Sequence, residues 1–62
     1  MDYTFDIFKK LGNGNSFWIT AVQGLEEARK RASRLASIAP GDYFIFSQRR
    51  GVVEYLNQEA YP

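Results

Sequence analysis

The 62-residue chain contains neither cysteine nor histidine. Without cysteine it can form no disulfide bond, no thiolate metal site and no thiol nucleophile. Without histidine it also lacks the side chain that most often serves as general acid, general base or metal ligand. The composition thus excludes catalytic groups built on histidine or cysteine and the usual zinc sites, and we expect no metal and no cofactor.

The remaining candidates for acid–base chemistry are carboxylates, which are scattered along the chain. They are Asp2, Asp6, Glu26, Glu27, Asp42, Glu54 and Glu59. Only Glu26 and Glu27 are adjacent, and in a helix their side chains would point about 100° apart. Two carboxyl groups flanking a cleft, as glycoside hydrolysis requires, are hardly within reach of so short a chain. We therefore expect no enzymatic activity and name no catalytic residue.

The charges nearly balance, because the chain has eight basic and seven acidic residues and a net charge of +1. Such a chain has no long-range field that would attract nucleic acid or an anionic membrane. The amino terminus has no basic segment followed by an apolar run, and no stretch approaches the roughly 18 apolar residues of a membrane span. We expect a soluble, cytoplasmic protein without a membrane partner.

Two runs at the start of the chain predict a β-hairpin. Residues Tyr3–Lys9 alternate apolar and polar side chains, which indicates a strand with one buried face. The glycine- and asparagine-rich segment 12–15 is typical of a tight turn, and the aromatic and β-branched run Phe17–Val22 follows it. Two alternating sets compete for the inward face of this second strand, and the sequence leaves the choice open. The sets are Phe17, Ile19 and Ala21, against Trp18, Thr20 and Val22.

A single amphipathic helix is predicted over Leu25–Ile38, between the break at Gly24 and the stop at Pro40. Most side chains of its apolar stripe are small. The stripe consists of Leu25, Ala28, Ala32, Leu35, Ala36 and Ala39, at helical spacing. Small side chains allow a helix to approach a sheet closely. The stripe therefore predicts tight packing against one sheet face.

A second hairpin is predicted from Tyr43–Ser47 and Val52–Leu56, joined by a turn at 48–51. The order ββαββ indicates an α+β fold of two layers: a four-stranded antiparallel sheet, with a mixed sheet as the alternative, and one helix on one face. Residues 1–56 form a single domain, and we expect residues 57–62 to be a flexible tail with Tyr61 as its only anchor. Two strand orders, 2-1-3-4 and 2-1-4-3, remain open.

The four predicted strands carry more apolar side chains than one helix can cover. They are Tyr3, Phe5, Ile7, Phe8, Phe17, Trp18, Ile19, Val22, Tyr43, Phe44, Ile45, Phe46, Val52, Val53, Tyr55 and Leu56. A helix about 10 Å wide covers roughly half of one face of a four-stranded sheet, which is about 19 Å wide. The uncovered face, or an open sheet edge, is therefore predicted to bind a protein, and homodimerisation is the simplest form of this binding.

The predicted contact residues are Phe8, Trp18, Tyr43 and Ile45, with Phe44 and Phe46 as the alternative to the last two. Exposed tryptophan and tyrosine often mark interfaces, because they give a large contact area for little lost conformational entropy. Trp18 has a second interpretation, as the largest core residue beneath the helix. Because a chain of this size has marginal stability, self-association would benefit it more than most.

Nucleic-acid binding is the alternative function, and its predicted contacts are the basic pairs Lys9 with Lys10 and Arg49 with Arg50. These pairs belong to hairpins that point in opposite directions, so we expect them at opposite ends of the sheet. A third basic run, 29–34, would distribute its charges around the helix instead of along one stripe. A phosphate-binding loop at 12–16 is excluded, because a strand and not a helix follows its glycines.

Three segments carry a resemblance to a known group of proteins: Gly24-Leu25-Glu26-Glu27-Ala28, the run from Pro40 to Phe46, and Gly51-Val52-Val53. Over nearly its whole length the chain resembles small uncharacterised bacterial proteins. These combine an Asp-Ile-Phe first strand, a tryptophan-bearing second strand, a Leu-Glu-Glu-Ala helix and a Pro-Gly-x-Tyr-x-Ile strand. The resemblance implies the ββαββ order, but it implies no activity and assigns no functional residue.

Overall fold

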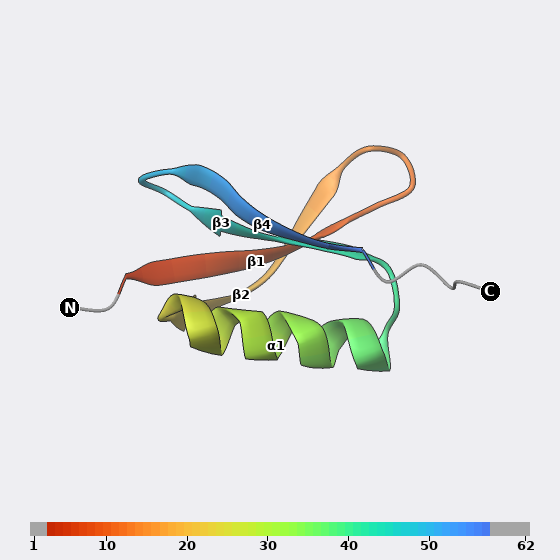
Figure 1. Cartoon of the computed structure of the whole chain (residues 1–62). Coiled ribbons are helices and arrows are strands. Elements are labelled where there is room, and N and C mark those ends of the chain that lie inside the picture. The colour runs from red at the N-terminus through yellow and green to blue at the C-terminus, as the bar shows by residue number, and fades with distance from the viewer. Residues whose placement is uncertain (1–2, 58–62) are drawn as a thin grey trace.

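The computed structural model describes residues 3–57, which form four strands and one helix (Figure 1). The elements are β1 (Thr4–Lys10), β2 (Ser16–Gln23), α1 (Leu25–Ile38), β3 (Asp42–Ser47) and β4 (Gly51–Asn57). The predicted α+β fold and its ββαββ order are confirmed. Asn57 ends β4, and the rest of the predicted tail, including Tyr61, lies outside the described residues.

The strands form one open antiparallel sheet in the order β2-β1-β3-β4. The first of the two predicted strand orders is therefore the one observed, and no mixed pairing is present among these strands. Figure 1 shows α1 along one face of the sheet, with both hairpin turns on the side away from the helix. Because α1 carries the chain back along the sheet, β3 begins beside the end of β1, where Asp42 lies opposite Lys10.

Each edge strand contains a β-bulge. In β2, Thr20 lies opposite Ile7 and Trp18 opposite Phe8, so Ile19 is an extra residue. In β4, Glu54 lies opposite Ile45 and Val52 opposite Phe46, so Val53 is an extra residue. A bulge reverses the inward and outward alternation beyond it. Ile19 and Val53 both pack against the core, and each edge strand therefore changes face along its length.

The core lies between α1 and the two central strands. It contains Phe5, Ile7, Ala28, Ala32, Ala36, Tyr43 and Ile45, with six partly buried apolar residues around them. The predicted alanine stripe is confirmed at Ala28, Ala32 and Ala36, which are all buried. Ala39 is exposed and caps the carboxyl end of the helix instead, where its N–H donates to the Leu35 carbonyl oxygen at 2.8 Å.

Gly24 allows the chain to turn sharply from β2 into the helix. Its φ of +87° lies in the left-handed region, which only glycine adopts without strain. Its N–H donates to the Tyr3 carbonyl oxygen at 2.8 Å, and its own carbonyl oxygen accepts the first helical bond from Ala28 at 3.0 Å. The same residue thus ends β2 and orients α1 across the sheet.

One ionic contact ties the helix to the outer strand β4. Arg29 Nε donates to Glu54 Oε1 at 2.8 Å, and its Nη1 donates to Glu26 Oε2 at 2.8 Å. The hydrogen bond from Arg29 to Glu54, together with the charge of that carboxylate, raises the pKa of Arg29 above its ordinary value. The contact therefore favours the charged form of the guanidinium, which arginine in any case keeps at physiological pH.

The close packing of α1 predicts that Ala32→Leu destabilises the fold by about 1–3 kcal/mol, because Ala32 is fully buried and the larger side chain must displace its neighbours. The exposed neighbour Ser33 provides the control, since Ser33→Leu adds a similar side chain on the solvent side. Urea denaturation followed by circular dichroism measures both. Equal stability of the two variants would contradict the close approach of helix and sheet.

Candidate interaction face

The face of the sheet opposite α1 carries one aromatic residue from every strand, at matching positions. Phe8 lies opposite Trp18 on one side and opposite Phe44 on the other, and Phe44 lies opposite Tyr55. These four residues form a continuous row across β2, β1, β3 and β4, which we call the aromatic row. The adjacent row on the same face contains Ala21, Asp6, Phe46 and Val52.

Side chains in and beside the aromatic row pack against each other. The rings of Phe8 and Phe44 are stacked, with centroids 5.1 Å apart and planes 6° apart. Phe46 meets Phe8 edge-on at 6.0 Å, and Tyr55 lies tilted against Phe44 at 5.9 Å. Such pairs contribute about 0.5–1.5 kcal/mol beyond their buried area. The rings of Phe8, Phe44, Phe46 and Tyr55 therefore hold each other in place on the open face.

Trp18 belongs to this face and not to the core, so its interpretation as a core residue beneath the helix is wrong. Its side chain is 53% exposed, and its Nε1–H donates to Asp6 Oδ1 at 3.2 Å on the same face. The bulge at Ile19 explains the placement, because it leaves Trp18 and Ala21 on the open side while Val22 faces the helix. Neither of the two alternating sets in β2 faces inward as a whole.

The predicted contact residues divide between the two faces. Phe8 and Trp18 lie in the aromatic row on the open face. Tyr43 and Ile45 do not, because they are 2% and 0% exposed and lie in the core beneath α1. Their assignment to the contact surface is wrong, and the alternative pair, Phe44 and Phe46, lies on the open face. The reason is register: Ile45 lies opposite Ile7, the fully buried residue of β1.

Tyr43 has a structural role instead. Its hydroxyl group donates to the Ala39 carbonyl oxygen at 2.5 Å, just past the end of the helix, and the Leu35 carbonyl oxygen, which also accepts from the Ala39 N–H, lies within reach at 3.3 Å. Lys9 lies over the same ring, with its Nζ 5.5 Å from the ring centroid. Tyr43 thus joins β3 to the carboxyl end of α1.

Tyr55 is a member of the aromatic row that the sequence analysis did not assign to the open face. It is 70% exposed and ends the aromatic row on β4. Simple alternation from Val52 would place Tyr55 on the opposite face from Val52, but the bulge at Val53 puts both on the open side. The pairing of Tyr55 with Phe44 would have placed Tyr55 on the open face, but that pairing follows only from the register of the second hairpin.

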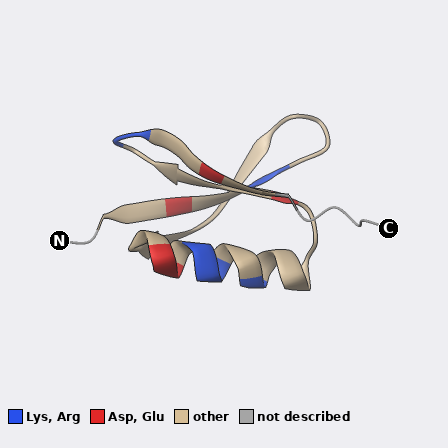
Figure 2. Cartoon of the chain, viewed as in Figure 1, with Lys and Arg blue, Asp and Glu red and all other residues tan. Residues whose placement is uncertain are grey.

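The basic residues are dispersed, as Figure 2 shows: the Lys9–Lys10 segment and the Arg49–Arg50 turn lie at opposite ends of the sheet. Lys9 faces the helix side, over Tyr43. Lys10 is exposed on the open side, two residues from Phe8 and directly opposite Asp42. Within the described residues of the strands, the open face thus carries Lys10 together with the carboxylates of Asp6 and Asp42, which leaves no excess of positive charge.

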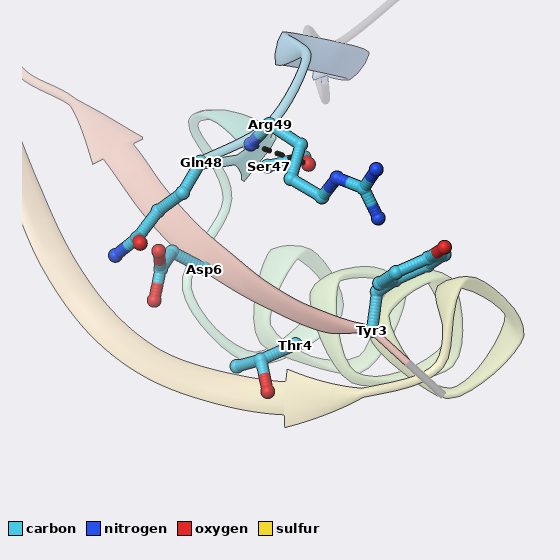
Figure 3. Close-up of a pocket in the computed structure, with 6 residues that line it drawn as sticks. All are labelled: Tyr3, Thr4, Asp6, Ser47, Gln48 and Arg49. Atoms are coloured by element: carbon cyan, nitrogen blue, oxygen red, sulfur yellow. Dashed lines mark hydrogen bonds between the residues drawn. The ribbon is translucent and has the colours of Figure 1, made fainter. Parts of the chain in front are cut away.

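A small depression of about 230 Å³ lies where the start of β1 meets the turn between β3 and β4 (Figure 3). Its lining is Tyr3, Thr4, Asp6, Ser47, Gln48 and Arg49. The guanidinium of Arg49 lies 4.8 Å from the centroid of the Tyr3 ring, and the backbone N–H of Arg49 donates to Ser47 Oγ at 3.2 Å. These contacts anchor the turn. The depression is smaller than the roughly 300–1,000 Å³ of ordinary ligand pockets, and its lining pairs no nucleophile with a base.

Comparison of the chain with protein-family models, with curated proteins and with solved structures finds no match. Among residues 3–57, no helix has the length and apolar character needed to cross a bilayer.

If the open face is not part of the core, Trp18→Ala should leave a folded protein. We expect a loss in unfolding free energy of less than about 1.5 kcal/mol, because the indole is already half exposed. Ile45→Ala, in the core, should cost about 2–5 kcal/mol. Thermal unfolding monitored by circular dichroism compares them, and a loss of cooperative unfolding in Trp18→Ala would place that residue in the core after all.

The link between Tyr43 and the helix end also predicts an effect on stability. Tyr43→Phe removes only the hydroxyl group and should cost about 1 kcal/mol, since the partly buried Ala39 carbonyl oxygen at the helix end loses this donor. Tyr55→Phe is the matched control on the exposed face and should be nearly neutral. Urea titration of both variants measures the difference, which would vanish if the Tyr43 hydroxyl did not stabilise the fold.

Proposed function

We propose that the chain is a non-catalytic protein-interaction module whose contact surface is the open face of the sheet. The observation that carries the proposal is the aromatic row, which crosses all four strands on the side that α1 leaves bare. Its outer members, Trp18 and Tyr55, are 53% and 70% exposed. Large aromatic residues in a contiguous, exposed patch are the usual anchors of protein interfaces.

The sheet face is a better contact surface than the sheet edges. Addition of a partner strand needs a regular edge, and both edge strands, β2 and β4, contain a bulge. Bulges increase the local twist of a strand and are one of the devices by which proteins prevent pairing at an edge. No such irregularity interrupts the centre of the face, where the rings of Phe8 and Phe44 are stacked with nearly parallel planes.

The charges favour a protein partner over nucleic acid. A sheet that binds a nucleic-acid strand needs basic side chains along the path of the backbone, beside the aromatic rings on which bases stack. Around the aromatic row, Lys10 is offset by Asp6 and Asp42, and Arg49 lies over Tyr3 at the far end. The dispersed basic pairs therefore give little support to the nucleic-acid alternative.

Site-specific photo-cross-linking tests the proposal. A benzophenone amino acid in place of Tyr55 keeps an aromatic group at an exposed position of the row, and the same group in place of Ile38 is the control, because that residue is 75% exposed on the helix. In cells that express the chain, we expect protein adducts from position 55 and few from position 38.

Two outcomes would contradict the proposal. Equal labelling from positions 55 and 38 would show that the open face is not a specific contact surface. Adducts from position 55 that nuclease removes, together with binding to mixed DNA and RNA that weakens steeply with salt and with Arg49→Ala or Arg50→Ala, would favour the nucleic-acid alternative.

A further inference from the structure

The open face is self-complementary about a line that runs between β1 and β3, parallel to the strands. Phe8 and Phe44 lie opposite each other on the two sides of this line. One strand further out, Trp18 lies beside Phe8 and Tyr55 lies beside Phe44. Turning a second copy over about this line would place each residue above its counterpart: Phe8 above Phe44, and Trp18 above Tyr55. A two-fold axis in this position therefore aligns the two aromatic rows along their whole length.

The same operation brings opposite charges together. Lys10 and Asp42 lie at matching positions on β1 and β3, two residues beyond Phe8 and two before Phe44. Alternation along a strand puts both on the open face, and both are exposed. In the paired arrangement Lys10 of each copy lies above Asp42 of the other, which gives two equivalent ion pairs at one end of the aromatic rows.

The size of the face argues for a partner that covers it completely. Four strands of about seven residues give a footprint of about 19 by 23 Å, or roughly 440 Å² per copy before the relief of the side chains is counted. Two such faces come close to the roughly 1,000 Å² of a specific interface only if the whole face is covered. A single helix about 10 Å wide would leave about half of it bare, whereas a second sheet of equal size covers it.

From these observations we propose that the occupant of the open face is a second copy of this chain. The two sheets pack face to face about the axis between β1 and β3, and the dimer has four layers, with the two sheets inside and the two helices outside. Asp6 keeps its hydrogen bond from Trp18 in this arrangement. This inference rests on the proposed function, because it names the partner of the same face.

Charge reversal tests the arrangement. Lys10→Asp places like charges above each other in the dimer, and so does Asp42→Lys. Each variant alone should therefore dimerise at least about tenfold more weakly than the wild type. A mixture of K10D and D42K restores opposite charges in both ion pairs, but only between the two different copies. We expect the mixture to form a heterodimer with nearly wild-type affinity.

The mixture separates contacts between copies from contacts within one copy. Lys10 and Asp42 are also cross-strand neighbours, so each single variant carries like charges within its own sheet. Mixing leaves that repulsion unchanged, and any recovery must come from the second copy. Lys30→Asp reverses a charge on the exposed side of α1 and is the control that should dimerise like the wild type.

Sedimentation equilibrium measures the affinity, and the single tryptophan reports on the face itself. Trp18 is half exposed in one copy and becomes covered in the dimer, so acrylamide quenching of its fluorescence should decrease as protein concentration rises. Circular dichroism verifies that each variant is folded. If K10D or D42K does not fold, Tyr55→Arg serves instead, because it places a charge at the exposed end of the row and should abolish dimerisation.

A wild-type chain that remains monomeric at millimolar concentration, with Trp18 fully quenchable, would overturn the dimer. A dimer that survives all three variants, or single variants that do not recover on mixing, would overturn the arrangement. The dimer and the proposed function fail separately: adducts from position 55 that contain a different protein would refute self-association while supporting the contact face, and no adducts at all would refute both.

Discussion

The close packing of Ala28, Ala32 and Ala36 against the central strands is the interaction on which the rest of the structure depends. Three methyl groups bring α1 close to the sheet, so the inner faces of β1 and β3 form a buried apolar core that contains Ile7 and Ile45. Within residues 3–57, α1 is the only helix, and it lies on one face of the sheet. The packing of α1 on one face of the sheet therefore leaves the aromatic row on the other face exposed.

The bulges of the two edge strands decide which of their side chains lie on the open face. A regular β2 would place Trp18 and Val22 on the same face, whereas the bulge at Ile19 separates them, so that Val22 joins the core and Trp18 the open face. On β4 the bulge at Val53 brings Val52 and Tyr55 to the open side in the same way. One irregularity per hairpin thus extends the stack of Phe8 and Phe44 into a row that crosses the sheet, and it also disfavours pairing at the edges.

The open face exposes large aromatic side chains to water, and it holds several of them in fixed positions. Its rings are held against each other, and Asp6 orients the indole of Trp18 through a hydrogen bond. Its charges are few: Lys10 and Asp42 lie at matching positions, and Asp6 accepts the hydrogen bond from Trp18. A surface of this kind loses little conformational entropy on binding, and covering it would add apolar burial to a core that one helix only half completes.

The sequence by itself determined the element order, the extent of the helix and the buried alanine stripe, because these follow from local periodicity and from turn residues such as Gly24 and Pro40. It also determined that the strands carry more apolar surface than one helix can cover. Only the tertiary structure decided on which face of the sheet each strand side chain lies. Tyr43 and Ile45 lie inward because Ile45 lies opposite Ile7, and Trp18 lies outward because a bulge precedes Thr20. Strand register and bulges depend on pairing between segments that are distant along the chain, so no local pattern determines them.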